Sequence, residues 1–155
     1  MSFDIVISGT IKNKHQVTQY THDVLSSFFT KRFRRSVEVW VHFRRQLDFG
    51  HYGFCHGDKN EAWIDIAKGY IDPISKTYIA YDYSTVLITL AHELVHAKQF
   101  IKGELSSDGR CWHQRGEVVD FTTKVHKQLP WETEADLLET RLYVKHWLNR
   151  HRAKV

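Results

Sequence analysis

A short run, His92-Glu93-Leu94-Val95-His96, contains the residue types that zinc enzymes use to bind metal and to move a proton. At about 3.6 residues per helical turn, His92 and His96 share one face of a helix, so both imidazoles can reach a single zinc ion. Glu93 lies about 100° further round, where its carboxylate can touch a water molecule on the metal. Zinc lowers the pKa of such a water towards ~7, and the carboxylate accepts its proton as the water attacks a carbonyl.

The segment around this motif is apolar, which makes polar groups within it costly. Apolar residues dominate from Ser84 or Thr85 onward, and Gly103 predicts the end of a buried helix. Two histidines and a glutamate inside such a helix would be destabilising without a ligand to satisfy them. The alternative is that both histidines hydrogen-bond polar partners inside a core helix, which requires no metal.

A catalytic zinc ion takes three protein ligands and leaves one position open. The downstream side chains able to complete the set are His113, Glu117, Asp120, His126, Glu132, Glu134 and Asp136. Pro130 suits the first position of a closing helix, on which Glu132 and Glu134 would point about 200° apart. Only one of these two acids can therefore face the metal. Either acid is also explained by the positive end of the helix dipole.

The second helix resembles that of the gluzincin peptidases, whose third zinc ligand is a glutamate in a Glu-x-x-x-Asp pattern, matched here by Glu132 and Asp136. Residues 85–140 are also similar to small zinc metallopeptidases of phage and bacterial genomes. The shared features are the sequence of residues 92–99, Gly103-Glu104-Leu105, Trp112 with Gly116, and residues 130–135. The resemblance implies a peptide-bond hydrolase in which Glu132 is the third zinc ligand and Asp136 orients a histidine from outside the ligand set.

A histidine is the alternative third ligand. SprT-type proteases, which act on proteins crosslinked to DNA, use a histidine shortly after the motif helix, and His113 lies in that region. The His-Gly-x-x-Trp surroundings of that histidine are missing, because Gln114 and Arg115 follow His113. We therefore favour Glu132. A zincin-like module that binds zinc or a peptide without turnover is the hypothesis from another class.

Two further parts of a peptidase site have candidates. Residues 63–66 precede the motif helix as the substrate-binding edge strand does in zincins, or else form an ordinary half-buried strand. Tyr143, Arg141 and His146 follow the glutamates on the closing helix, and one of them could stabilise the oxyanion. Each of the three is equally well explained as helix surface or core.

Hydrophobic periodicity predicts an α+β fold that would position the motif. The expected elements are strands at 3–8, 37–43, around Phe54 and at 61–67, a helix over 14–33, the motif helix, a hairpin at 111–121, and a helix from Pro130 to the basic residues 150–154. We expect a zincin-like architecture, with a small mixed or antiparallel sheet packed on the motif helix and flanked by N- and C-terminal helices. Residues 1–155 would form one domain.

Composition limits the other function classes. The chain is 42% hydrophobic and 26% charged, with 22 Lys and Arg against 18 Asp and Glu, which is an ordinary globular balance. The basic residues are scattered, so nucleic-acid binding is less favoured than a solvated surface of mixed charge, and a protein or peptide is the expected partner. We expect Cys55 and Cys111 to be buried thiols rather than ligands, with His56 and His113, of a structural zinc. No signal peptide or membrane span is evident, which predicts a cytoplasmic protein, of the host cell if phage-encoded.

Overall fold

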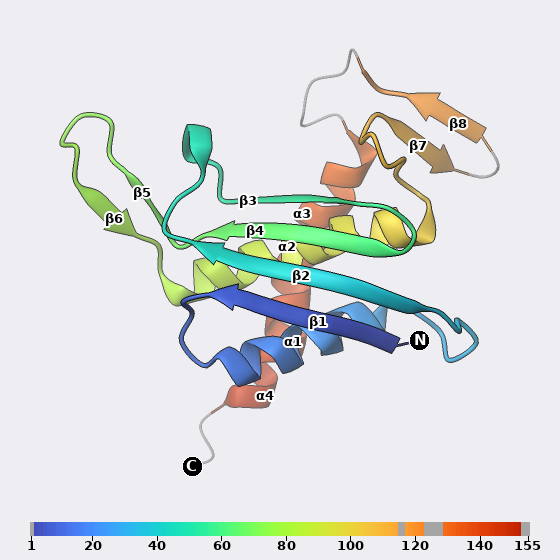
Figure 1. Cartoon of the computed structure of the whole chain (residues 1–155), viewed down its shortest axis with the longest axis horizontal. Coiled ribbons are helices and arrows are strands. Elements are labelled where there is room, and N and C mark those ends of the chain that lie inside the picture. Colours follow the sequence, from blue (N-terminus) through green and yellow to red (C-terminus); the bar gives the residue numbers. More distant parts are fainter. Residues whose placement is uncertain (1, 115–116, 123–128, 153–155) are drawn as a thin grey trace.

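The computed structural model describes residues 2–114, 117–122 and 129–152. Its main sheet has the order β1-β2-β4-β3, built from β1 (Ser2–Gly9), β2 (Ser36–Arg44), β4 (Glu61–Ala67) and β3 (Gly53–Gly57). β1, β2 and β4 run parallel, and β3 is antiparallel to β4, so the sheet is mixed. Figure 1 shows these four strands lying side by side with the helices packed on them. The expected mixture of helices and small sheets is confirmed.

One face of the sheet forms the core. Inward side chains alternate with outward ones, and the inward set consists of Val37, Val39, Val41, Phe43, Ala62, Ile64 and Ile66. Burial of one face at strand period fixes the register, because a slip of one residue would turn every apolar side chain outward. The helices α1 (Lys14–Ser27) and α2 (Tyr83–Lys102) cover this face, and α3 (Pro130–Tyr143) packs against α2.

The first helix is shorter than the spacing of its apolar residues predicted. α1 ends at Ser27, and Phe28 and Phe29 follow it. The ring of Phe29 packs on Phe3 of β1 and on Phe33, with centroids 5.6 and 4.9 Å apart. These aromatic side chains cover the apolar edge beside β1 without helical backbone, which is why the periodicity continued past the true end of the helix.

The helix that contains the motif is the most deeply buried element. α2 ends where Gly103 was expected to stop it, because Gly103 adopts φ 73° and its N–H bonds the carbonyl of Phe100 at 3.0 Å. A left-handed residue at this position favours glycine. The hydroxyl of Tyr20 on α1 donates to the Leu87 carbonyl at 3.0 Å, joining the two helices within the core. α2 is therefore anchored in the core of the protein.

The C-terminal part places a second helix against α2. α3 starts at Pro130 as predicted, and its buried Trp131 and Ala135 face inward. It continues through a π-helical turn, Val144–Leu148, into α4 (Asn149–His151). The predicted hairpin forms as β7 (Cys111–Gln114) and β8 (Glu117–Asp120), and a further two-stranded sheet pairs β5 (Gly69–Ile71) with β6 (Tyr78–Ala80). Trp112 of β7, Phe100, Leu105 and Trp131 form a second apolar cluster that joins hairpin and helices.

Of the two interpretations of residues 63–66, the substrate-binding edge strand is wrong and the ordinary half-buried strand is confirmed. Residues 63–66 lie in β4, which has β2 on one side and β3 on the other, so its backbone groups are already paired. The sheet has β1 and β3 as its edge strands, and β3 is the one that lies directly over α2. In the described part of the chain, no helix combines the length and the apolar character needed to cross a membrane.

Candidate metal centre

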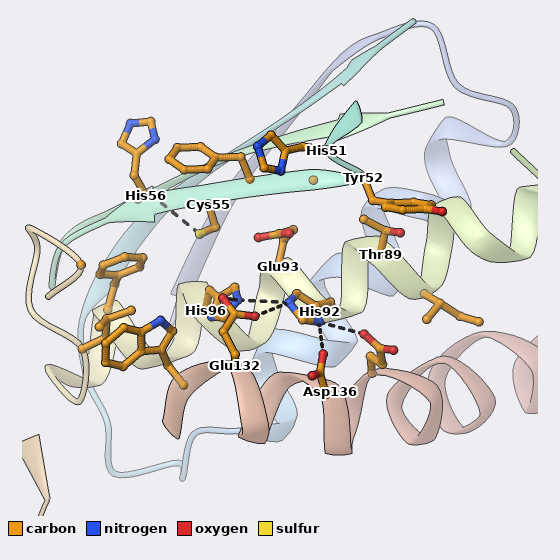
Figure 2. A pocket seen from close by; sticks show the side chains of 18 of the residues that line it. His51, Tyr52, Cys55, His56, Thr89, His92, Glu93, His96, Glu132 and Asp136 are labelled. Atoms are coloured by element: carbon orange, nitrogen blue, oxygen red, sulfur yellow. Dashed lines mark hydrogen bonds and ion pairs between the residues drawn. The ribbon is translucent and has the colours of Figure 1, made fainter. Parts of the chain in front are cut away.

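The two motif histidines point to the same side of α2, towards α3. Their Nε2 atoms are 3.2 Å apart. Glu132, in the first turn of α3, places one carboxylate oxygen 3.1 Å from His92 Nε2 and the other 3.2 Å from His96 Nε2. Figure 2 shows these three side chains meeting in the space between the two helices. They form a group whose donor atoms could hold one metal ion.

The outer nitrogens of both rings face hydrogen-bond acceptors. His96 Nδ1 lies 2.8 Å from Gln99 Oε1, and His92 Nδ1 lies 2.8 Å from Glu139 Oε2. Each Nδ1 therefore donates a proton, which leaves the lone pair of each neutral imidazole on Nε2. Two Nε2 lone pairs and a carboxylate then converge within 3.2 Å. Such a convergence requires a cation, either added protons or a metal ion.

In the metal-free site, the pKa values of the two histidines show the same need for positive charge. Burial alone would lower the pKa of His92, but its hydrogen bond to Glu132, the charge of Glu93 and the bond to Glu139 raise it to about 9. The pKa of His96 is raised in the same way, since Glu132 and Glu93 outweigh its burial. Without a metal, protons take the place of the cation between these residues.

This arrangement predicts a pH-dependent stability for the metal-free protein. Folded His92 keeps its proton up to about pH 9, whereas the unfolded chain loses it near 6.5. The proton on His92 stabilises the folded state fully at pH values below 6.5, the pKa of His92 in the unfolded chain. This stabilisation is lost as the pH rises through about 9, the pKa in the folded protein. The free energy of unfolding should therefore fall by ~1–2 kcal/mol over this window. Denaturant unfolding in the presence of a chelator measures it.

Added zinc should show the opposite trend. Zinc needs the same Nε2 atoms without protons, so it should raise the melting temperature more at about pH 8.5 than at about pH 6. Thermal unfolding with zinc and with chelator at both pH values gives the comparison. An equal zinc effect at the two pH values would argue against binding through these histidines.

Glu93 points from the adjacent side of α2 towards β3. It is buried, with 6% exposure, and burial raises the pKa of its carboxyl to about 7, while the neighbouring His96 and His92 charges lower it. Figure 2 shows Glu93 between the histidine pair and the strand that contains Cys55. Burial, followed by the charge of Glu93, raises the pKa of the Cys55 thiol well above its usual range. A carboxyl that titrates near neutral pH can both accept and return a proton.

Glycine at position 53 is what allows β3 to pass so close to Glu93. A Cβ atom on Gly53 would lie 2.8 Å from Glu93 Oε1 and 2.9 Å from Thr89 Cγ2. Gly53→Ala should therefore push the carboxylate aside, leave zinc affinity nearly unchanged, and lower peptide turnover roughly 10–100-fold, because small misplacements of a reacting group are costly. Zinc titration and peptide turnover of the same preparation test this prediction.

Gly50→Ala, three residues earlier, is the control for loss of a glycine. No atom lies within 4 Å of its new methyl group, and its φ of 69° adds a backbone strain that Gly53→Ala does not have, so the control is the more demanding change away from Glu93. If Gly53→Ala turned over peptide as fast as the control, Glu93 would not be the group that the strand holds in place.

The site opens into a groove of about 940 Å³. α2 forms its floor, with β3 along one side and α3 along the other, as Figure 2 shows. Leu105 and residues 107–109 line one end beside Trp131 and Phe100, and Thr85, Thr89 and Thr140 lie towards the other. The groove therefore extends along α2 on both sides of the histidine pair.

No protein-family model, curated protein or solved structure matches this chain. The geometry of the site is therefore the evidence on function.

The structure separates the candidate third ligands. Of the residues proposed from sequence, Glu132 joins His92 and His96, whereas Glu134 turns away and bonds Lys98 Nζ at 2.7 Å. His113 is exposed on β7 and belongs to none of the potential metal groups in the described residues. His126 lies outside the described residues. Glu117 and Asp120 are exposed on β8, away from the groove.

The outer partners of His92 were only partly predicted. Asp136 lies beside His92 Nδ1 at 3.5 Å, but Glu139 is closer at 2.8 Å and is the hydrogen-bond partner. Glu139 was missed, although positions 132, 136 and 139 share one helical face and this spacing could have revealed it. Gln99, the partner of His96, was also missed, and its place three residues after His96 on the same helix was the available signal.

The residues proposed to stabilise the oxyanion lie away from the groove. Tyr143, Arg141 and His146 do not line the groove, and Tyr143 is buried in the main core. His51 and Tyr52, at the start of the edge strand, line the groove instead and lie on the same side of α2 as Glu93 in Figure 2. Cys55 and Cys111 are free thiols of intermediate exposure, and among the described residues neither belongs to a group that could hold a metal.

Proposed function

We propose that the chain is a zinc-dependent metallopeptidase of the zincin type, in which His92, His96 and Glu132 hold the metal and Glu93 is the general base. One observation carries the proposal: two Nε2 atoms and a carboxylate lie within 3.2 Å of one another, while both Nδ1 atoms donate to acceptors outside the group. Two imidazoles and a carboxylate are a ligand set of catalytic zinc sites. The groove beside them leaves room for an open coordination position.

The residues divide the chemistry between two faces of α2. Bound zinc would supply an activated water molecule and polarise the carbonyl of the substrate. Glu93, on the face towards β3, would take a proton from that water and pass it to the leaving amine. Its carboxyl is buried and its pKa is raised to about 7, so both transfers can occur near neutral pH. Asp136 and Glu139 would hold His92 in the orientation that binds metal.

The edge strand supports a peptide as the substrate. Tyr52 O accepts from Ala67 N–H and Asp58 N–H donates to Glu61 O, both at 2.9 Å. Because hydrogen-bonded pairs alternate in an antiparallel ladder, the backbone groups of Gly53, Cys55 and Gly57 point away from β4. An extended peptide could add there as a further strand and cross the groove above the metal ligands. The position of the motif helix α2 beneath this free edge of β3 also supports a zincin-like fold.

The test is cleavage of a peptide library by the zinc-loaded protein, analysed by mass spectrometry with and without a chelator. We expect new peptide termini that disappear with chelator and return when zinc is added back. A protein that binds one zinc ion with high affinity and cleaves none of the library would instead support the non-catalytic binding module. Absence of zinc binding would remove the metal site itself.

A further inference from the structure

Two buried polar residues follow the motif and have no part in the proposed chemistry. Lys98 and Gln99 lie less than one turn beyond His96 on α2. Gln99 is fully buried, and only 8% of the Lys98 side chain is exposed. Burial of an amide and an ammonium group is unfavourable unless each is fully hydrogen-bonded, so their partners indicate why they stand there.

Gln99 connects the two elements that supply the metal ligands. Its Oε1 accepts from His96 Nδ1 at 2.8 Å. Its Nε2 donates to the Trp131 carbonyl and to Glu134 Oε1, each at 3.0 Å. Trp131 immediately precedes Glu132 in the first turn of α3. One side chain therefore contacts a candidate ligand on α2 and the backbone next to a candidate ligand on α3.

The same contacts fix which way the amide faces. If the amide were turned over, its oxygen would meet the Trp131 carbonyl and the Glu134 carboxylate, and its NH₂ group would face His96. Two acceptor pairs would then be in contact inside the protein, where Gln99 is fully buried. The observed orientation is therefore strongly preferred, and it obliges His96 Nδ1 to donate. That leaves the lone pair of His96 on Nε2, where a metal needs it.

Lys98 secures the outer end of this chain of contacts. Its Nζ lies 2.7 Å from Glu134 and 2.8 Å from Glu104, the second residue after α2. The ammonium group holds Glu134 where Gln99 Nε2 can reach it, and Glu104 O accepts from His113 N–H at the start of the hairpin. The buried charge is thus neutralised by carboxylates from two separate segments.

We propose that Gln99 is a positioning residue that sets the donor state of His96 and holds Glu132 opposite it, with Lys98 and Glu134 fixing the direction of its amide. The inference rests on the proposed metal site but not on catalysis, and its readouts are metal affinity and a ring proton. Loss of an outer partner of a ligand histidine typically lowers metal affinity ~10–100-fold.

Three variants test the direction of the amide. Gln99→Met keeps the volume and removes every hydrogen bond, and should bind zinc roughly 10–100-fold more weakly in competition with a chelator. Gln99→Glu should also bind weakly, because its carboxylate would face that of Glu134. The exchange Q99E/E134Q places an acceptor at 99 and a donor at 134. It removes the clash with residue 134 but not that with the Trp131 carbonyl, so it should recover part of the affinity lost in Gln99→Glu. Gln19→Met on α1, where Gln19 bonds Asp23, is the matched control.

A spectroscopic readout distinguishes positioning from a general loss of stability. In the zinc-loaded wild type, the Nδ1 proton of His96 should be visible by NMR and slow to exchange; it should exchange fast in Gln99→Met and slowly again in the exchange variant. If Gln99→Met fails to fold, Gln99→Glu and the exchange variant suffice. Wild-type affinity in Gln99→Met, or no recovery in Q99E/E134Q, would overturn the inference. A wild type that does not bind zinc would instead refute the proposed metal site.

Discussion

Replacing Glu93 by glutamine should leave zinc binding intact and lower peptide hydrolysis by roughly 10²–10⁴-fold, the usual contribution of a general base. Glutamine has the size and shape of glutamate, so the packing of α2 against β3 is preserved. It cannot accept the proton of a metal-bound water. Glu93 lies beside the ligand group but does not belong to it, so its charge is not needed to hold the ion in place.

The measurement is turnover of a library-derived peptide together with zinc stoichiometry on the same sample. Glu38→Gln is the matched control, since Glu38 is exposed on the outer face of β2 and lines no part of the groove. Hydrolysis by Glu93→Gln at the control rate would remove the proposed mechanism. A variant that lost both zinc and activity would show that Glu93 supports the site rather than the chemistry.

The local parts of this molecule could be predicted from sequence, because their causes are local. The limits of β4 and the start of α3 at Pro130 follow from strand alternation and proline geometry, and the stop of α2 at Gly103 from the left-handed cap. The shared face of His92 and His96 follows from helix geometry alone. None of these predictions required knowledge of a distant neighbour.

The parts that the sequence alone could not decide depend on how distant segments meet. Strand order decides which strand is an edge, and nothing within residues 63–66 indicates that β3 folds back to cover β4. The choice between Glu132 and Glu134 likewise depends on the rotation of α3 about its axis. That rotation is set by burial of Trp131 and Ala135 against α2 and by the pairing of Glu134 with Lys98. The sequence contained these residues, but only the packing assigns their partners.

The rotation of α3 places Glu132 at the histidine pair, and from this follows the second large expected effect, a loss of zinc affinity. Glu132→Ala should lower zinc affinity well beyond the ~10–100-fold that loss of an outer partner costs, because it removes a carboxylate that contacts both Nε2 atoms. Glu134→Ala should cost roughly 10-fold at most, since Glu134 acts only through Lys98 and Gln99. His113→Ala should bind zinc like the wild type.

Chelator competition on the three variants ranks the candidates directly. The two glutamates are two residues apart in the same helical turn and undergo the same substitution, so changes in helix propensity and charge cancel between them. A difference in affinity can then arise only from what each carboxylate contacts. If Glu134→Ala or His113→Ala lost zinc while Glu132→Ala retained it, the ion would lie elsewhere than between His92 and His96. The proposed peptidase chemistry, with Glu93 beside the metal-bound water, would then have no geometric basis.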